Sequence, residues 1–217
     1  MSSSETYKMT YLSHRGMAEP IRLMFAYAGV KYTDERLTHE SLPARKPELP
    51  WGTLPVLEVR PGKSETTFVL AQVAAIGRYL AKKFDLDAKT EEAAAKCDEY
   101  VDAVKDFGQE FVNWVKFSDE DAKAAQILEI REKHAPHYFA KFEAILSKNG
   151  AGWLVGNRMT WADIFAANHL YNWAKFLGDG NMDGFNRDFP NITKLTENVF
   201  AHEGIAKWIK ERPDTPF

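Results

Sequence analysis

The sequence is poor in cysteine, since Cys97 is the only one in 217 residues. A single cysteine excludes intramolecular disulfides, thiolate metal clusters and C-x-x-C redox chemistry. Long apolar runs are also missing, and none approaches the roughly 18–20 residues that a membrane span needs. The opening residues, M-S-S-S-E-T-Y, have neither a basic start nor an apolar stretch, so we expect no secretory signal. These absences predict a cytoplasmic protein without a membrane partner.

A strong charge of one sign is missing too. The net charge is −3 at pH 7, which argues against a nucleic-acid partner. Basic residues outnumber acidic ones in residues 1–84, and the reverse holds in the remainder of the chain. This division fits either a chance scatter of surface charge or an N-terminal part that suits a small anion. The hydrophobic fraction, 45%, is enough for a full core.

The first 84 residues alternate short β-rich segments with helical patterns. A strand, a helix and a second strand in that order imply a parallel pair with a right-handed crossover. Two further strands flank the turn-rich link R-P-G-K-S-E and predict an antiparallel hairpin. The predicted elements are strand 7–12, a helix closed by Gly29, strand 31–37, hairpin strands 55–60 and 66–70, and a helix over about 72–84. Together they predict a compact mixed-sheet unit.

From residue 91 onward the patterns predict helices alone, after a boundary at 84–90. A long first helix would carry one apolar stripe, made of Tyr100, Val104, Phe107, Phe111 and Val115. Ser118 would cap a second helix that runs to about 147. Thr160 and Asp163 resemble a capping box, and shorter helices are expected near 190–200 and 204–211. His134 and His137 are spaced i, i+3 without a third ligand, so we expect no metal site.

Pro55 stands directly before a run of strand formers, in W-G-T-L-P-V-L-E-V. Proline cannot donate a ladder hydrogen bond, so Pro55 belongs at the first residue of its strand. It is a candidate for a cis bond, which would expose the backbone of Leu54. An exposed backbone beside a helix N-terminus can hold a peptide-like, anionic ligand.

Five segments in this order resemble the cytosolic glutathione S-transferases, most closely the sigma and nematode-type branch. They are Y-K-M-T-Y-L-S-H-R-G-M-A-E-P-I-R, P-W-G-T-L-P-V-L-E-V, Q-V-A-A-I-G-R-Y-L-A, M-T-W-A-D and R-P-D-T-P-F. The resemblance covers nearly the whole chain. It implies a thioredoxin-like domain over 1–84, an all-helical domain over 91–217, a homodimer, and detoxification with glutathione as co-substrate and no other cofactor.

Glutathione conjugation needs a thiolate, and a free thiol with a pKa of about 8.5 is mostly protonated at pH 7. A tyrosine hydroxyl can lower that pKa by donating a hydrogen bond to sulfur. Tyr11 sits at the tyrosine position of the family motif, which implies this catalytic role. Tyr7 is the alternative, because both residues share strand parity. Arg15 matches the arginine before the family glycine and either shapes the turn or adds positive field near sulfur.

The resemblance also implies which residues bind glutathione. The Leu54 backbone would pair with the cysteinyl part, Gln72 would contact the γ-glutamyl end, and Lys46 would meet the glycyl carboxylate. Asp106 would reach the γ-glutamyl ammonium of the neighbouring subunit. The alternatives are an ordinary helix N-terminal residue for Gln72 and solvated surface positions for Lys46 and Asp106.

Three positions of the tripeptide site depart from the family pattern. Val73 stands where the family has a serine that holds the γ-glutamyl carboxylate. Loss of the serine hydroxyl would weaken glutathione binding roughly tenfold to a hundredfold, although the helix amide at this position remains. Leu42 replaces a common aromatic residue, and Thr53 replaces a common Lys or Gln.

The second-substrate pocket is expected between the domains, where ligand clefts often form. Its candidate wall residues are His14, Phe111, Trp114 and Phe217, with core packing as the alternative for the aromatic ones. The resulting hypothesis is a glutathione transferase for small hydrophobic electrophiles. The alternatives are a glutathione-dependent isomerase like a prostaglandin D synthase, and a low-activity ligand-binding or structural relative.

Overall fold

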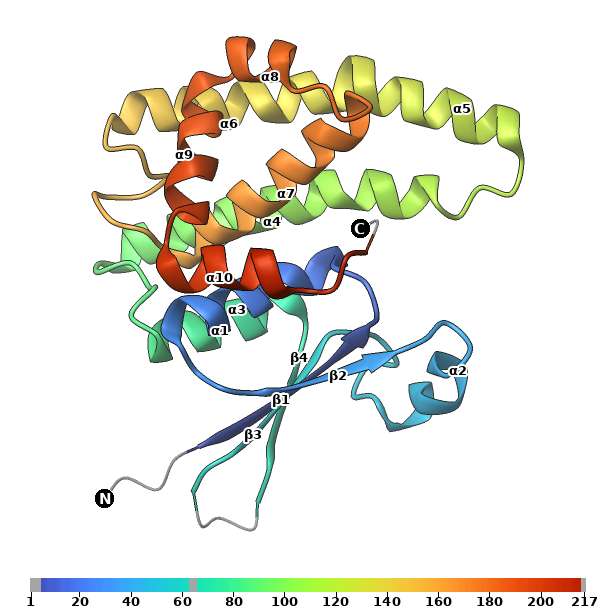
Figure 1. The fold of residues 1–217 in the computed structure, drawn as a ribbon, viewed down its shortest axis with the longest axis vertical. Coiled ribbons are helices and arrows are strands. Elements are labelled where there is room, and N and C mark those ends of the chain that lie inside the picture. The colour runs from blue at the N-terminus through green and yellow to red at the C-terminus, as the bar shows by residue number, and fades with distance from the viewer. Residues whose placement is uncertain (1–4, 63–65, 216–217) are drawn as a thin grey trace. The chain divides into compact units, whose positions relative to one another are not determined.

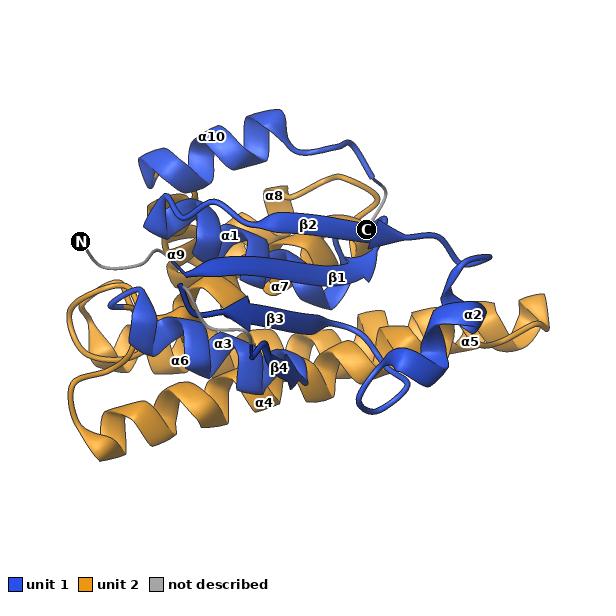
Figure 2. Ribbon diagram, turned by 90° about the horizontal axis from the view of Figure 1, so that it is seen from below, with its two compact units in different colours: residues 1–85, 202–217 blue, residues 86–201 orange. Residues whose placement is uncertain are grey.

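The computed structural model describes residues 5–62 and 66–215, which divide into two compact units (Figures 1 and 2). The first unit comprises residues up to 85 together with the segment from 202 onward, and the second comprises residues 86–201. The C-terminal segment therefore groups with the sheet, although the sequence places it in a helical domain that runs to the end. Within the described residues, no helix is both long enough and apolar enough to cross a bilayer.

A four-stranded mixed sheet forms the first unit, and its strand order is β2-β1-β3-β4. The strands are β1 Thr6–Leu12, β2 Thr33–Leu37, β3 Val56–Arg60 and β4 Phe68–Ala71. β1 and β2 are parallel, whereas β3 is antiparallel to both β1 and β4. The predicted parallel pair and the predicted hairpin are both confirmed. Tyr11 lies opposite Arg36 near the C-terminal end of β1.

Helices α1 and α3 cover one face of this sheet (Figure 1). The helices of the first unit are α1 Glu19–Ala28, α2 Leu42–Arg45, α3 Val73–Lys83 and α10 Glu203–Glu211. Gly29 ends α1 in the left-handed conformation, with φ 63°, as the sequence predicts. α10 packs against α1 so closely that a Cβ at Gly204 would lie 2.1 Å from the Ala26 carbonyl oxygen. This approach attaches the C-terminal segment to the sheet domain.

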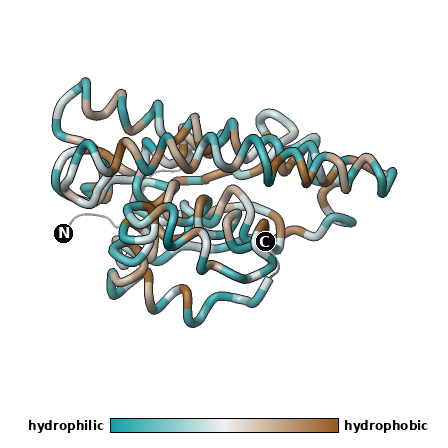
Figure 3. Tube along the Cα trace, turned by 90° about the horizontal axis from the view of Figure 1, so that it is seen from above, coloured by the Kyte–Doolittle hydropathy of each residue, from teal (hydrophilic) through white to brown (hydrophobic). Residues whose placement is uncertain are grey.

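The described part of the second unit is helical. Its helices are α4 Glu91–Trp114, α5 Glu120–Glu129, α6 Ala135–Asn149, α7 Trp161–Leu177, α8 Asp183–Asp188 and α9 Pro190–Phe200. Hydrophilic and hydrophobic positions alternate along the helices of the protein, the pattern of amphipathic helices (Figure 3). The capping box of Thr160 and Asp163 is present at the start of α7, where Asp163 also accepts from the Leu154 amide at 2.7 Å.

Three details of the helical part differ from the sequence prediction. Val115 lies just beyond the end of α4 and is 60% exposed, so it does not continue the apolar stripe. Asp119, not Ser118, caps α5, because its side chain accepts from the Ala122 amide at 2.8 Å. α8 was not predicted, since its six residues are too short for a periodic pattern.

The helix predicted to run to about 147 is interrupted by a π-helical turn, Ile130–His134. Pro136 has no backbone N–H and follows this turn directly. The Ala135 amide bonds to the Ile130 carbonyl, one residue farther back than in an α-helix. Proline is thus the physical reason for the break.

Candidate active site

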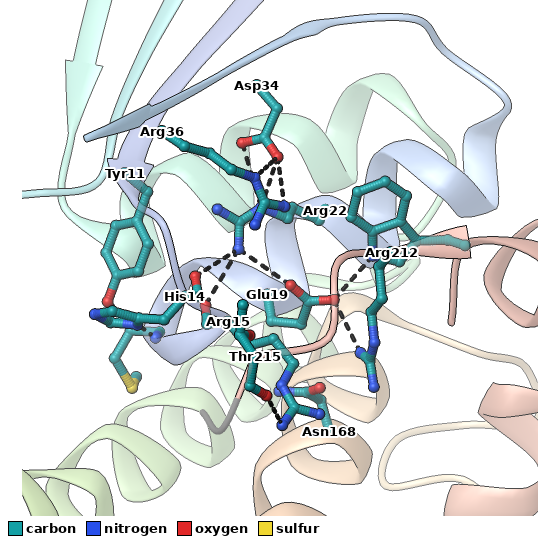
Figure 4. Close-up of polar contacts among 12 residues, drawn as sticks. Tyr11, His14, Arg15, Glu19, Arg22, Asp34, Arg36, Asn168, Arg212 and Thr215 are labelled. Carbon is teal, nitrogen blue, oxygen red and sulfur yellow. Dashed lines mark hydrogen bonds and ion pairs between the residues drawn. The ribbon is translucent and has the colours of Figure 1, made fainter. Parts of the chain in front are cut away.

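Tyr11 lies where β1 meets the turn that leads into α1 (Figure 4). Its side chain is buried, and its hydroxyl oxygen accepts a hydrogen bond from the Met17 amide at 3.2 Å. The Arg22 guanidinium lies 5.8 Å from the centre of its ring, and the His14 imidazole packs edge-on against it at 5.4 Å. The phenol is therefore enclosed by one short turn and one buried cation.

Gly16 makes this turn possible. Its φ is +44°, a conformation that strongly favours glycine. A Cβ at this position would lie 2.6 Å from the Tyr11 hydroxyl oxygen and 2.9 Å from the His14 ring. The R-G pair of the sequence motif is thus explained by close approach of the backbone to the phenol.

The hydroxyl of Tyr11 is kept in its protonated form. Burial raises the pKa of Tyr11, and the Met17 hydrogen bond and the Arg22 charge oppose this effect without cancelling it. The Met17 amide occupies one lone pair of the oxygen, and no described residue accepts the hydroxyl proton, which remains available to a further acceptor. Such a hydroxyl can donate to an anion placed beside it.

Tyr7 has a different environment, although it shares the strand face. Its hydroxyl donates to the Glu5 carboxylate. Its ring packs edge-on against Phe25 at 5.4 Å and against Phe84 at 6.2 Å. The proton that a ligand would need is already bonded within the protein.

Arg15 and His14 belong to the same turn as Gly16. Arg15 Nη2 donates to the backbone oxygen of Thr215, and burial lowers the pKa of this guanidinium. The His14 ring stacks on His39 at 6.0 Å, and its Nδ1 is buried without a hydrogen-bond partner. Burial, followed by the charges of His39 and Arg22, lowers the pKa of His14. A neutral imidazole therefore adjoins the phenol.

The Leu54–Pro55 bond is cis, as predicted, and β3 begins at the next residue. The Leu54 backbone forms no hydrogen bond with any other described residue. The side chains of Leu42 and Leu54 pack against one apolar cluster, which consists of Leu49, Val56 and Ala71. This cluster joins α2, the start of β3 and the end of β4.

Gln72 follows directly and adopts φ 75° and ψ 117° at the N-cap of α3. A non-glycine residue with positive φ is uncommon, and such outliers concentrate at ligand sites. Ile76 donates to the Gln72 carbonyl at 2.9 Å, whereas the amides of residues 73–75 have no acceptor among the described residues. The side chain of Gln72 is exposed and that of Val73 is buried. Free amides at a helix N-terminus can bind an anion.

The remaining residues predicted to bind glutathione are exposed. Lys46 lies at the junction of α2 with the 3-10 turn Lys46–Glu48, and Thr53 precedes the cis bond by two residues. Asp106 lies on the exposed side of α4. Burial, and after it the charge of Asp106, raises the pKa of Tyr138. No described residue bonds to these three side chains, so each is free for a ligand or for solvent.

Phe111 and Trp114 belong to an aromatic cluster inside the second unit. Phe111 stacks on Trp173 at 5.2 Å, and Trp114 packs against Phe176 at 5.3 Å. Both are half-buried, and Trp114 Nε1 is buried without a hydrogen-bond partner. Phe217 lies outside the described residues. The assignment of Phe111, Trp114 and His14 to an electrophile site stays a prediction.

Two hollows of the second unit contain none of the predicted site residues. One, of about 420 Å³, is lined by apolar side chains that include Phe139, Leu177 and Phe185. The other, of about 480 Å³, is lined by polar groups that include Glu110 and His134. Within residues 5–62 and 66–215, no group of three or more His, Cys, Asp or Glu is placed to hold a metal ion.

Sequence reasoning missed two residues beside Tyr11. Glu19 and Arg22 are 1% and 0% exposed, and they form an ion pair at 3.1 Å. An acidic and a basic residue spaced i, i+3 are usually read as a solvated helix face. The signal in the sequence was the position of Arg22 between Ile21 and Leu23, which are also fully buried.

Comparison with known proteins identifies the relatives of this chain. Residues 105–212 match the family model described as glutathione S-transferase, C-terminal domain. Glutathione S-transferase 1 of Ascaris suum is 39% identical over 219 residues, which cover 97% of this chain and 98% of that protein. The structure of prostaglandin synthase D of Nilaparvata lugens has a TM-score of 0.85 at 31% identity, covering 97% of this chain and 100% of its own. Monomeric Na-GST-3, a glutathione S-transferase of the hookworm Necator americanus, has a TM-score of 0.80 at 36% identity, covering 98% and 100%.

Proposed function

The chain belongs to the glutathione S-transferase family, a family of transferase enzymes with glutathione as co-substrate, and we propose that it conjugates the glutathione thiolate to small hydrophobic electrophiles. The fold class predicted from the sequence, a thioredoxin-like domain followed by a helical domain, is confirmed by the matching structures. One observation carries the proposed mechanism: the Tyr11 hydroxyl is buried, protonated and free to donate.

In this mechanism Tyr11 donates a hydrogen bond to the glutathione sulfur. The bond favours the thiolate over the thiol, and each unit by which the thiol pKa falls corresponds to about 1.36 kcal/mol. The thiol proton passes to solvent, and the thiolate forms a C–S bond to the electrophile directly. A substitution breaks the bond to the leaving group (chloride in chlorodinitrobenzene), and an addition takes up a proton, so no covalent enzyme intermediate forms. Tyr7 is the weaker candidate because its proton is bonded to Glu5.

The tripeptide is proposed to lie along the segments that carry Leu54 and Gln72. The unpaired Leu54 backbone suits the peptide-like cysteinyl part, and the free amides at the start of α3 suit the γ-glutamyl carboxylate. Lys46 is proposed to meet the glycyl carboxylate, and Thr53 contributes from the loop before Pro55. Leu42 supports this loop through its apolar packing. Arg15 is proposed to shape the turn beside sulfur.

A homodimer is proposed, in which Asp106 reaches the glutathione of the neighbouring subunit. The exposed side chains of Trp51, Phe68 and Val69, at 73%, 45% and 46% exposure, support an apolar interface on the first unit. Light scattering is then expected to give about twice the monomer mass. A monomer mass, as in the hookworm relative, would remove Asp106 from the site. Detoxification in the cytoplasm is part of the same proposal.

Tyr11→Phe tests the mechanism. The variant is expected to bind glutathione as the unchanged protein does and to lose about 10²–10³-fold in conjugation rate at neutral pH, since one hydrogen bond to a developing anion is removed. Tyr7→Phe is the matched control, with the same atom removed from the same strand face. Steady-state rates with chlorodinitrobenzene and calorimetric titration of glutathione measure both. An unchanged rate in Tyr11→Phe would refute the assignment.

A glutathione-dependent isomerase is the second candidate. It is favoured by the similarity to prostaglandin synthase D of Nilaparvata lugens. Product analysis with an endoperoxide substrate separates isomerisation from conjugation. A ligand-binding relative with little turnover is the third candidate, and the apolar Val73 favours it. Retention on immobilised glutathione without turnover of chlorodinitrobenzene would select this third candidate.

A further inference from the structure

The turn that encloses Tyr11 is attached to the C-terminal segment through buried charges (Figure 4). Arg22 Nη1 donates to the backbone oxygens of His14 at 3.0 Å and Arg15 at 3.3 Å. The same nitrogen bonds to Glu19 Oε2 at 3.1 Å. Arg22 therefore ties the turn to the Glu19 carboxylate, and both side chains are out of contact with solvent.

The other oxygen of Glu19 is bound by the last helix. Oε1 accepts from Trp208 Nε1 at 2.8 Å and from Arg212 Nη1 at 2.9 Å. These donors lie 189 and 193 residues away along the chain. A second link joins the same regions, because Arg15 Nη2 donates to the backbone oxygen of Thr215. The segment 208–215 is thus linked to the turn 14–17 in two ways, directly through Arg15 and indirectly through Glu19 and Arg22.

We propose that Glu19 and Arg212 are positioning residues for Tyr11, because they hold the turn 14–17 where the Met17 amide and Gly16 meet the phenol. This inference rests on the proposed function, in which Tyr11 stabilises the thiolate. The position of the turn matters because a Cβ at Gly16 would lie only 2.6 Å from the hydroxyl oxygen, so a small shift of the turn displaces the donor.

Charge pairing explains why the network is sensitive to Arg212. Glu19 is bonded by three cationic or polar donors, and a buried carboxylate that loses one of them must find another. Arg22 is shared between Glu19 and Asp34, whose carboxylate it meets at 3.1 Å. Arg36 also pairs with Asp34, at 2.8 Å. Without Arg212, Glu19 competes more strongly for Arg22 and draws it from the two carbonyls of the turn.

Arg212→Met tests the proposal, with Lys210→Met as the matched control. Both changes remove one cation from the end of α10, but Lys210 is exposed and forms no hydrogen bond or ion pair with the described residues of the network. Arg212→Met is expected to raise the pH at half-maximal rate by about half to one pH unit, which lowers the rate at neutral pH about threefold to tenfold. The KM for glutathione is expected to stay unchanged, and Arg212→Lys is expected to recover part of the rate.

A purely structural role would give a different result. Arg212→Met would then lower the melting temperature and leave the pH profile equal to that of Lys210→Met, and this outcome overturns the proposal. If Arg212→Met does not fold, Trp208→Phe removes the other donor to Glu19 and keeps a large aromatic ring. The Tyr11→Phe variant separates the two hypotheses: a normal rate there refutes the proposed function, whereas a low rate there with normal Arg212→Met kinetics refutes only the positioning role.

Discussion

The two ends of the proposed glutathione site are built in opposite ways. Around Tyr11, the phenol, Glu19 and Arg22 are 8%, 1% and 0% exposed and each has defined partners. Around the cis bond, Lys46, Thr53 and Gln72 are exposed and their side chains have no bonds to other described residues. A hydroxyl that changes the pKa of a thiol has to be fixed and shielded from water. A surface that binds the charged ends of a tripeptide has to stay open to it.

Val73, Leu42 and Thr53, the three positions expected from the sequence to depart from the family pattern, all lie near the cis bond and not around Tyr11. The turn beside Tyr11 carries the R-G pair of the sequence motif. The comparison predicts that substitutions at the enclosed end change the reaction rate and that substitutions at the open end change glutathione affinity.

Among these substitutions, Gly16→Ala is expected to change the conjugation rate most. An unchanged rate would contradict the difference drawn between the two ends of the site. Its Cβ would meet the Tyr11 hydroxyl at 2.6 Å, so the phenol must move. A displaced donor is expected to lower the conjugation rate about a hundredfold. Rates at saturating glutathione measure this loss.

Gly29→Ala is the matched control for this change. Its φ is also positive, at +63°, but a Cβ there would touch nothing within 4 Å. Both variants should lose about 1–2 kcal/mol of unfolding free energy through the left-handed backbone. Only Gly16→Ala should lose activity. Equal activities in the two variants would show that close packing on the phenol is unimportant for the rate.

Val73→Ser is expected to have the smaller effect, at the open end. The new hydroxyl can bond to the γ-glutamyl carboxylate, and a hydrogen bond to a charged group contributes about 1.5–3 kcal/mol. Part of this gain is lost because Val73 is buried, so we expect about tenfold tighter glutathione binding. Calorimetric titration measures the Kd, and kcat should change little.

Val73→Ala separates the hydroxyl from the loss of the two methyl groups. It should not tighten binding. If Val73→Ser and Val73→Ala bind glutathione equally, the helix amides alone hold the carboxylate, and valine at position 73 does not weaken glutathione binding.

Much of this fold was predictable because its signals are local. The strand–helix–strand pattern, the hairpin, the Gly29 cap and the Thr160–Asp163 capping box each depend on residues that are close in sequence, and each is present. The details that were missed involve competition between neighbours. Asp119 displaced Ser118 as the cap, and the missing amide of Pro136 produced a π-helical turn in a helix that otherwise reads as continuous.

The sequence by itself determined the fold class, the candidate cis bond before β3 and Tyr11 as the predicted catalytic tyrosine, with Tyr7 as its rival. Periodicity, turn residues and proline chemistry act over a few residues, so they can be recognised in the sequence. The family motif favoured Tyr11 over Tyr7, and the tertiary structure added the physical difference between them, because the Tyr11 hydroxyl accepts from a backbone amide whereas the Tyr7 hydroxyl donates to a carboxylate. The tertiary structure alone brought Arg212 to Glu19, because a buried carboxylate finds its partners through space, 193 residues away along the chain.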